Sequence, residues 1–119
     1  MMNSLLLVGA GGAAGSMIRF LLQRYINTSH YPFGTLAANV GGCLLIGILM
    51  GLLTKDLITE QNRLLLMTGF CGGFTTFSSI TMESFSLWEQ NRWAAFAGYI
   101  FLSVGLGLLA TFAGYKLSS

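Results

Sequence analysis

Apolar residues dominate four stretches of the chain, at about residues 4–22, 33–53, 64–88 and 93–115. Short polar segments separate them, and these segments carry residues such as His30 and Asp56. A helix that crosses the hydrocarbon core of a bilayer needs ~20 mostly apolar residues. The pattern therefore predicts an all-α membrane protein with four transmembrane helices, each running through one of these stretches.

Composition supports this interpretation, because only 8% of the 119 residues are charged and 54% are hydrophobic. Soluble domains carry roughly 25% charged residues. Four spans of ~20 residues use about 80 positions, which leaves short loops and predicts a single transmembrane domain over residues 1–119. The segment before the first stretch lacks the basic residues of a cleaved signal peptide, so we expect that stretch to remain as a span.

The charged residues also exclude several classes of function. The net charge is +2 without a basic cluster, so nothing predicts binding to nucleic acid. One histidine and two cysteines provide no metal-ligand spacing. His30 lies in a loop, and Glu83 has no second acid near it in its span. The chain therefore has no carboxylate pair or serine–histidine–acid triad, and we expect no enzyme.

The third stretch differs from the others, because residues 64–74 are too short a run of apolar residues to cross a bilayer. Gly72 and Gly73 then precede four hydroxyl residues within positions 75–79. One interpretation is a helix interrupted near the middle of the membrane, since broken helices at that depth bind ions or substrates. The other is a continuous helix whose hydroxyls bond back to the preceding turn.

Small residues recur four positions apart in three of the stretches. Such pairs allow helix backbones to approach closely in lipid and predict a compact bundle or a dimer. The pairs are Gly11 with Gly15, Gly47 with Gly51, and Ser103 with Gly107.

The basic residues are distributed evenly between the two sides of the predicted bundle. Lysine and arginine asymmetry sets the orientation of a membrane protein. One side would carry Lys55, Arg63 and Lys116, and the other Arg19, Arg24 and Arg92. With three on each side there is no bias, which indicates dual topology and pairing with an inverted copy of the chain.

Polar side chains within the spans are candidates for lining a conduit. Thr35 and Asn39 share a face of the second span, and Tyr99, Ser103 and Thr111 lie along one face of the fourth. Each set is explained either by hydrogen bonding between helices or by donors that replace the water around a passing ion. The sequence leaves both explanations open.

Two aromatic residues and one arginine complete the candidate lining. Phe74 and Phe77 flank the hydroxyl run. The edge of an aromatic ring is weakly positive and suits a small anion. Aromatic packing between helices is the other explanation, and it is the commoner role of such rings. Arg19 is interpreted as an anchor that reaches to the membrane surface, or alternatively as a charge at a pore mouth. Neutral donors suit rapid transit, because an ion must bind weakly enough to leave.

Three motifs together resemble the Fluc (CrcB) fluoride channel family. Residues 15–19 are similar to its G-x-x-x-R segment, and residues 34–39 to its G-T-L-x-x-N segment. Residues 68–79 resemble its motif G-x-x-G-G-x-[ST]-T-F-S-T-F. With four spans in 119 residues, the resemblance extends over essentially the whole chain.

The resemblance implies a passive fluoride channel in the bacterial inner membrane, built as a dual-topology antiparallel homodimer with two pores. It implies a central structural sodium ion on the backbone carbonyls of Gly72 and Thr75. It makes Asn39 the pore amide, places Arg19 near a vestibule and makes Glu83 the acid late in span three. The full set of implied pore residues is Arg19, Asn39, Phe77, Ser79, Ile80, Glu83, Tyr99, Ser103 and Thr111.

Two positions depart from the family pattern. Ile80 stands where the second pore phenylalanine is expected, and Gly107 where a serine often stands. Ile80 is explained by a natural variant, an engineered substitution, or a heterodimer whose paralogous partner supplies the ring. A small multidrug-type antiporter is an alternative, but it needs an acid deep in span one, and that span has none. A purely structural membrane subunit is another.

Overall fold

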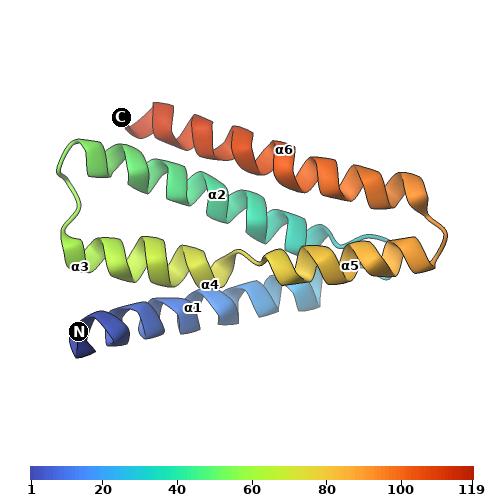
Figure 1. Ribbon diagram of the computed structural model, residues 1–119, viewed down its shortest axis with the longest axis horizontal. Coiled ribbons are helices and arrows are strands. Elements are labelled where there is room, and N and C mark those ends of the chain that lie inside the picture. Colours follow the sequence, from blue (N-terminus) through green and yellow to red (C-terminus); the bar gives the residue numbers. More distant parts are fainter.

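The computed structural model describes residues 1–119 and is entirely helical. Figure 1 shows its elements. In chain order they are α1 (Met2–Ile26), α2 (Phe33–Thr54), α3 (Glu60–Asn62), η1 (Arg63–Cys71), α4 (Gly72–Phe74), α5 (Phe77–Glu89) and α6 (Trp93–Ser118). Helices α1, α2 and α6 and the composite third helix Glu60–Glu89 are each long and apolar enough to cross a membrane.

The helices extend beyond the apolar stretches from which they were predicted. Helix α1 continues to Ile26, four residues past position 22, and the third helix already begins at Glu60. Thr59 caps that beginning, because its hydroxyl accepts the N–H of Asn62 at 3.2 Å. Apolarity marks only the part of a helix that suits lipid, whereas polar residues at its ends satisfy the same backbone hydrogen bonds.

The four long helices lie side by side in an elongated body of 48 × 31 × 22 Å. Helix α1 packs mainly against η1 and α4, and α2 packs mainly against α6. Figure 1 shows both termini and the loop between α2 and α3 at one end of the body, as the four-span topology requires. The α1–α2 connection and the α5–α6 turn lie at the other end.

Glycines allow the closest of these helix contacts, as the small-residue pairs predict. A Cβ atom on Gly11 would overlap the backbone of Leu65 and Phe70 on η1. A Cβ atom on Gly47 of α2 would likewise overlap the backbone of Thr111 on α6. Neither neighbour can move aside without displacing a helix, so these positions fix the distance between the helix axes.

Many large apolar side chains lie on the molecular surface, and only 19 of the 119 residues are buried. The side chains of Phe101, Leu109 and Phe112 on α6 are all largely exposed. Soluble monomers rarely expose contiguous apolar patches of this extent. The lateral surface of the bundle is therefore suited to lipid or to a second protein chain.

Candidate functional site

The third helix is interrupted at Thr75 and Thr76, which have extended backbone conformations with ψ of 151° and 115°. The hydroxyl of Thr75 accordingly bonds back to the carbonyl of Cys71 at 2.8 Å, ending the first part. The side chain of Thr76 then caps the second part by accepting the N–H of Ser79 at 3.2 Å. Of the two interpretations of this stretch, the interrupted helix is therefore the one that the structure adopts.

The glycines of the motif do not themselves form the interruption. Gly72 and Gly73 both remain helical within α4, and the chain leaves the helix two residues later. Gly73 instead serves packing, because a Cβ atom there would overlap the backbone of Gly12 on α1. The hydroxyl residues provide the change in backbone direction, since their side chains replace the lost helical hydrogen bonds.

Asn39 on α2 holds the interruption from one side. Its amide oxygen accepts the N–H of Thr76 at 2.7 Å, and its amide nitrogen donates to the carbonyl of Thr76 at 3.3 Å. Asn39 is itself buried. An extended residue between two helices loses its helical partners, and this amide replaces both of them.

Arg19 on α1 holds the interruption from the other side. Its Nε donates to the carbonyl of Gly73 at 3.0 Å, and Nη1 donates to the Oε1 of Gln23 at 3.4 Å. The interpretation of Arg19 as an anchor reaching to the membrane surface is therefore wrong in this structure. The carbonyl of Gly73 lies just before the interruption. It holds the guanidinium inside the bundle by accepting a charge-assisted hydrogen bond from it.

Next to the interruption, α1, α2 and α5 enclose a cluster of polar side chains. Nε2 of Gln23 donates to Oγ1 of Thr35 and to Oγ of Ser79, each at 3.1 Å. Oε2 of Glu83 accepts the hydroxyl of Thr35 at 2.9 Å and the amide of Asn27 at 3.3 Å. The other carboxylate oxygen of Glu83 is buried without a hydrogen-bond partner. We call these five residues the polar cluster.

Two members of the polar cluster were not among the predicted candidates: Gln23 and Asn27. The prediction ended the first span at position 22 and so placed Gln23 and Asn27 outside it. Their spacing held the missing signal, because Arg19, Gln23 and Asn27 recur every four residues and share one helix face. Since α1 continues to Ile26, that face reaches α2 and α5.

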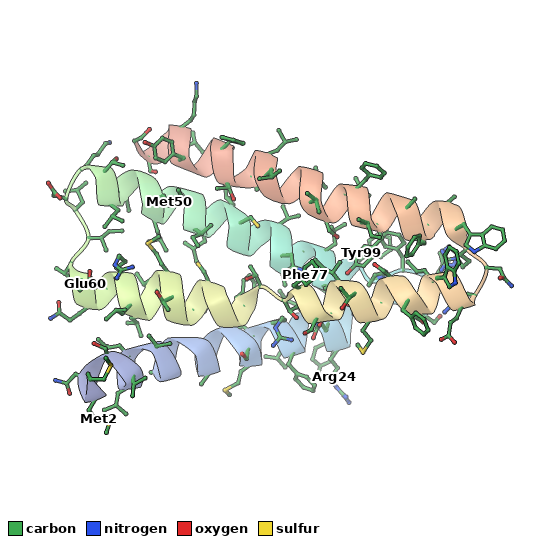
Figure 2. The ribbon with its side chains drawn as sticks, viewed as in Figure 1. Met2, Arg24, Met50, Glu60, Phe77 and Tyr99 are labelled. Carbon is green, nitrogen blue, oxygen red and sulfur yellow. The ribbon has the colours of Figure 1, made fainter.

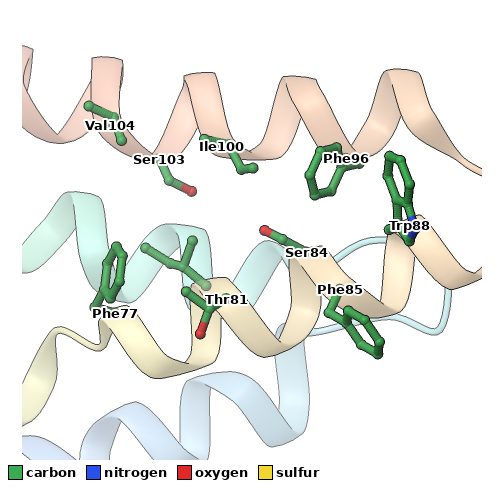
Figure 3. Close-up of a pocket in the computed structure, with 10 residues that line it drawn as sticks. Phe77, Thr81, Ser84, Phe85, Trp88, Phe96, Ile100, Ser103 and Val104 are labelled. Carbon is green, nitrogen blue, oxygen red and sulfur yellow. The ribbon is translucent and has the colours of Figure 1, made fainter.

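The opposite face of α5 borders a groove of about 600 Å³ between α5 and α6. Phe77 lines it beside the interruption, and its side chain is 77% exposed in the single chain. Figure 2 labels Phe77 at the beginning of α5. Ile80 also lines the groove. So do Ser84 and Ser103, as the close-up in Figure 3 shows. The predicted pore residues are therefore divided between two faces of α5.

Phe74, the other aromatic candidate, packs inside the bundle. Its ring stacks on Phe70 with centroids 5.5 Å apart and planes inclined by 21°. A stacked ring turns its face towards its neighbour. Phe74 also borders Gly41 and Gly42 of α2. Packing is therefore the role that the structure gives to Phe74.

The three predicted pore residues of α6 are buried or half-buried, but they have different partners. Thr111 donates to the carbonyl of Cys43 on α2 at 3.1 Å and thus joins two helices. The hydroxyls of Tyr99 and Ser103 are buried without a hydrogen-bond partner. The ring of Tyr99 meets Tyr31 edge-on, with centroids 5.6 Å apart and planes at 81°. Of these three residues, Tyr99 and Ser103 retain free donors.

The loop before α2 closes the end of the bundle near Glu83. Arg92, after α5, donates from Nη1 to the carbonyl of His30, and its Nη2 lies 3.1 Å from Nε2 of the same residue. Partial burial raises the pKa of the Tyr31 phenol, and the charge of Arg92 opposes that rise. A polar pocket of about 230 Å³ beneath the loop reaches Glu83.

Comparison with known proteins gives a consistent result. Residues 6–115 match the family described as CrcB-like protein, Camphor Resistance (CrcB). The chain is 42% identical to the fluoride-specific ion channel FluC of Phocaeicola vulgatus, covering 98% of this chain and 99% of that protein. It is 44% identical to FluC of Pseudomonas fluorescens (99% and 98% covered) and 44% identical to FluC of Rhizobium etli (94% and 93% covered).

These matches extend over the whole bundle, including the interrupted helix and the residues that hold it. The family is one of ion channels and not of enzymes, and the four long apolar helices are the membrane spans of a multi-pass membrane protein. The chain belongs to the CrcB/FluC family of fluoride-specific ion channels.

Proposed function

We propose that the chain is a passive, fluoride-selective channel that exports cytoplasmic fluoride across the bacterial inner membrane. The observation that carries the proposal is family membership over the full chain, together with a third span interrupted beside neutral donors and an exposed aromatic ring. A small, strongly hydrated anion needs close hydrogen-bond donors in place of water. Chloride is larger and is excluded from a narrow path of this kind.

The direction of transport follows from acid–base chemistry and the membrane potential. Hydrogen fluoride enters cells uncharged and ionises in the neutral cytoplasm, where the anion is trapped. A potential that is negative inside drives an anion outward with ~2.3 kcal/mol per charge per 100 mV. A passive pore is therefore sufficient for export, and neither a coupling ion nor an energy source is required.

We assign the pore to the residues around α5. Phe77 contributes the positive edge of its ring, and Ser79, Tyr99 and Ser103 contribute hydroxyl donors. Asn39 acts at the interruption, where its amide is already bonded to Thr76. Three further residues complete the proposed set and act at the ends of the path: Arg19, Glu83 and Thr111.

The functional unit is proposed to be an antiparallel homodimer with two pores. Basic residues are nearly balanced between the two ends of the bundle, with Arg19 at the interruption between them, which is consistent with insertion in both orientations. Phe77 is largely exposed in the single chain, and a second copy would close the open side of the groove that it lines. Ile80 favours one alternative, a heterodimer in which this chain is the non-conducting subunit.

The backbone at the interruption fits the structural sodium ion of the family. The carbonyl of Thr75 accepts no hydrogen bond, and the N–H groups of Thr75 and Thr76 bond elsewhere, so neither reaches the carbonyl of Gly72. Carbonyl oxygens are suitable ligands for hard cations. Gly72 and Thr75 would hold the ion at the dimer centre, where its charge would link two copies.

The first test is fluoride efflux from liposomes that contain only this purified chain, with chloride efflux as the control. We expect rapid release of fluoride and none of chloride. Absence of release from a folded dimer would show that the chain needs a partner or that Ile80 disables the pore. Equal release of both anions would contradict the proposed selectivity.

A further inference from the structure

Two buried hydroxyls face the groove between α5 and α6 and have no partner. The side chains of Ser84 and Ser103 are only 4% and 6% exposed. Neither Oγ atom makes a hydrogen bond, either to its own helix or to the other serine. Figure 3 shows the two hydroxyls pointing into the groove from opposite helices.

Unpartnered hydroxyls at such depth are unusual. A buried serine in a helix normally bonds to the carbonyl one turn before it, which satisfies its donor at little cost. Ser84 does not, although Thr81 in the same helix bonds the carbonyl of Ser78 at 2.9 Å. Buried polar groups without partners are rare in native structures and call for a bound species.

The surroundings determine which species fits. The groove contains no charged side chain, and apart from Thr81 and the two serines its lining is aromatic or aliphatic. Two neutral O–H donors in an apolar groove suit a small monovalent anion. A cation would find only the hydroxyl oxygens of Thr81 and the two serines there and no carboxylate ligand.

The position along α5 links this site to the departure at Ile80. Ile80 and Ser84 are four residues apart, so they lie on one helix face, and both line the groove. An isoleucine side chain offers no hydrogen-bond donor or positive ring edge to an anion. Ser84 supplies a donor one turn further along the same wall, opposite Ser103.

We infer that Ser84, together with Ser103, forms a fluoride-binding site in the groove that takes the place of the aromatic ring absent at Ile80. The inference rests on the proposed channel function and specifies which side chains of this chain dehydrate the ion. Ser84 contributes through its hydroxyl hydrogen, and the second copy of the dimer covers the site.

The test is fluoride efflux from liposomes with Ser84→Ala, compared with Ser86→Ala as the matched control. Ser86 lies on the same helix, but its hydroxyl is exposed and accepts a hydrogen bond from Gln90. A hydrogen bond to a charged group is worth more than a neutral one, so efflux through Ser84→Ala should fall about tenfold. Ser86→Ala should retain the wild-type rate.

Two further variants separate loss of the donor from loss of the fold. Ser84→Cys keeps a similar shape with a weaker donor and should give an intermediate rate. Ile80→Phe added to Ser84→Ala should restore much of the efflux, because a ring edge returns to the same wall. Each variant is first checked for assembly as a dimer in detergent.

The outcomes distinguish this inference from the function on which it rests. Wild-type efflux that persists in both Ser84→Ala and Ser84→Cys would overturn the site while leaving the channel intact. Absence of fluoride efflux from the wild-type chain would overturn the proposed function and the site with it. If Ser84→Ala loses efflux and adding Ile80→Phe does not restore it, Ser84 does not take the place of the aromatic ring absent at Ile80.

Discussion

Asn39 makes two hydrogen bonds to the main chain of Thr76, at 2.7 and 3.3 Å, from a buried position on α2. The resemblance to the family led us to predict Asn39 as the pore amide. In this structure its oxygen accepts the N–H of Thr76, and one of its two amide hydrogens goes to the carbonyl of Thr76. Its effect on an ion is therefore at least partly indirect, through the conformation of the backbone that the ion meets.

We expect Asn39→Ala to destabilise the protein and to reduce fluoride efflux. The change leaves the N–H of Thr76 buried without its acceptor, which costs about 1–3 kcal/mol. Asn62→Ala is the control, since Asn62 is exposed and its side chain makes no hydrogen bond. Thermal unfolding of the purified proteins in detergent measures the difference. Equal midpoints for the two variants would show that the amide does not hold the interruption.

Site residues with a chemical signature were predictable, and those defined by helix length were not. Glu83 and Asn39 stand out as polar residues within apolar spans, and both lie at the site. Gln23 was missed because residues beyond a charged position look like a loop when only hydropathy is considered. For Thr111 the sequence left two explanations open, and the hydroxyl bonds the carbonyl of Cys43 between helices, as the first of them describes.

At the scale of the elements, the contact between α1 and the third helix depends on glycine. Gly11 and Gly15 of α1 face η1 and α4 so closely that a Cβ atom on either would overlap backbone atoms. The small-residue spacing predicted this contact. The π-helical winding of η1 was not predicted, because no residue type distinguishes it from an α-helix and the packing of the finished bundle determines it.

Gly11→Ala and Gly9→Ala provide a matched pair on α1. A Cβ atom on Gly11 overlaps the backbone of η1, whereas one on Gly9 has nothing within 4 Å. We expect Gly11→Ala to lower the free energy of unfolding by about 1–3 kcal/mol, as overpacking does. Gly9→Ala should be neutral or slightly stabilising, because alanine favours helix. Chemical unfolding in detergent makes the comparison, and equal effects would exclude a close α1–η1 contact.

At the scale of the whole molecule, basic residues are nearly balanced between the two ends of the bundle, as the proposed insertion in both orientations requires. One end carries Lys55, Arg63 and Lys116 and the other Arg24 and Arg92, while Arg19 lies at the interruption. The overall architecture of four apolar helices was predictable, since composition and hydropathy determine it. The surface through which the chain would pair with another copy was not predictable, because exposed apolar side chains contact lipid and protein equally well.

Adding positive charge at one end should fix the orientation. Gln61→Lys with Ser119→Lys places two more lysines at the end that holds both termini, and this end should then face the cytoplasm. Two reporters fused to the C-terminus, each active on only one side of the membrane, measure the result. Both should be active on the wild-type chain and only the cytoplasmic one on the variant. A single active reporter on the wild-type chain would contradict dual topology.

The partners of the helices have a consequence for synthesis of the chain. Helix α1 packs mainly against η1, which the ribosome makes some forty residues later, and α2 packs mainly against α6, the last helix. Helix α2 therefore does not meet its principal neighbour until translation is nearly complete, and α1 meets its own only after the ribosome has passed the midpoint of the chain. A nascent chain arrested before Trp93 would expose the glycine face of α2 in the bilayer, a feature by which membrane quality control can distinguish unfinished chains from complete ones.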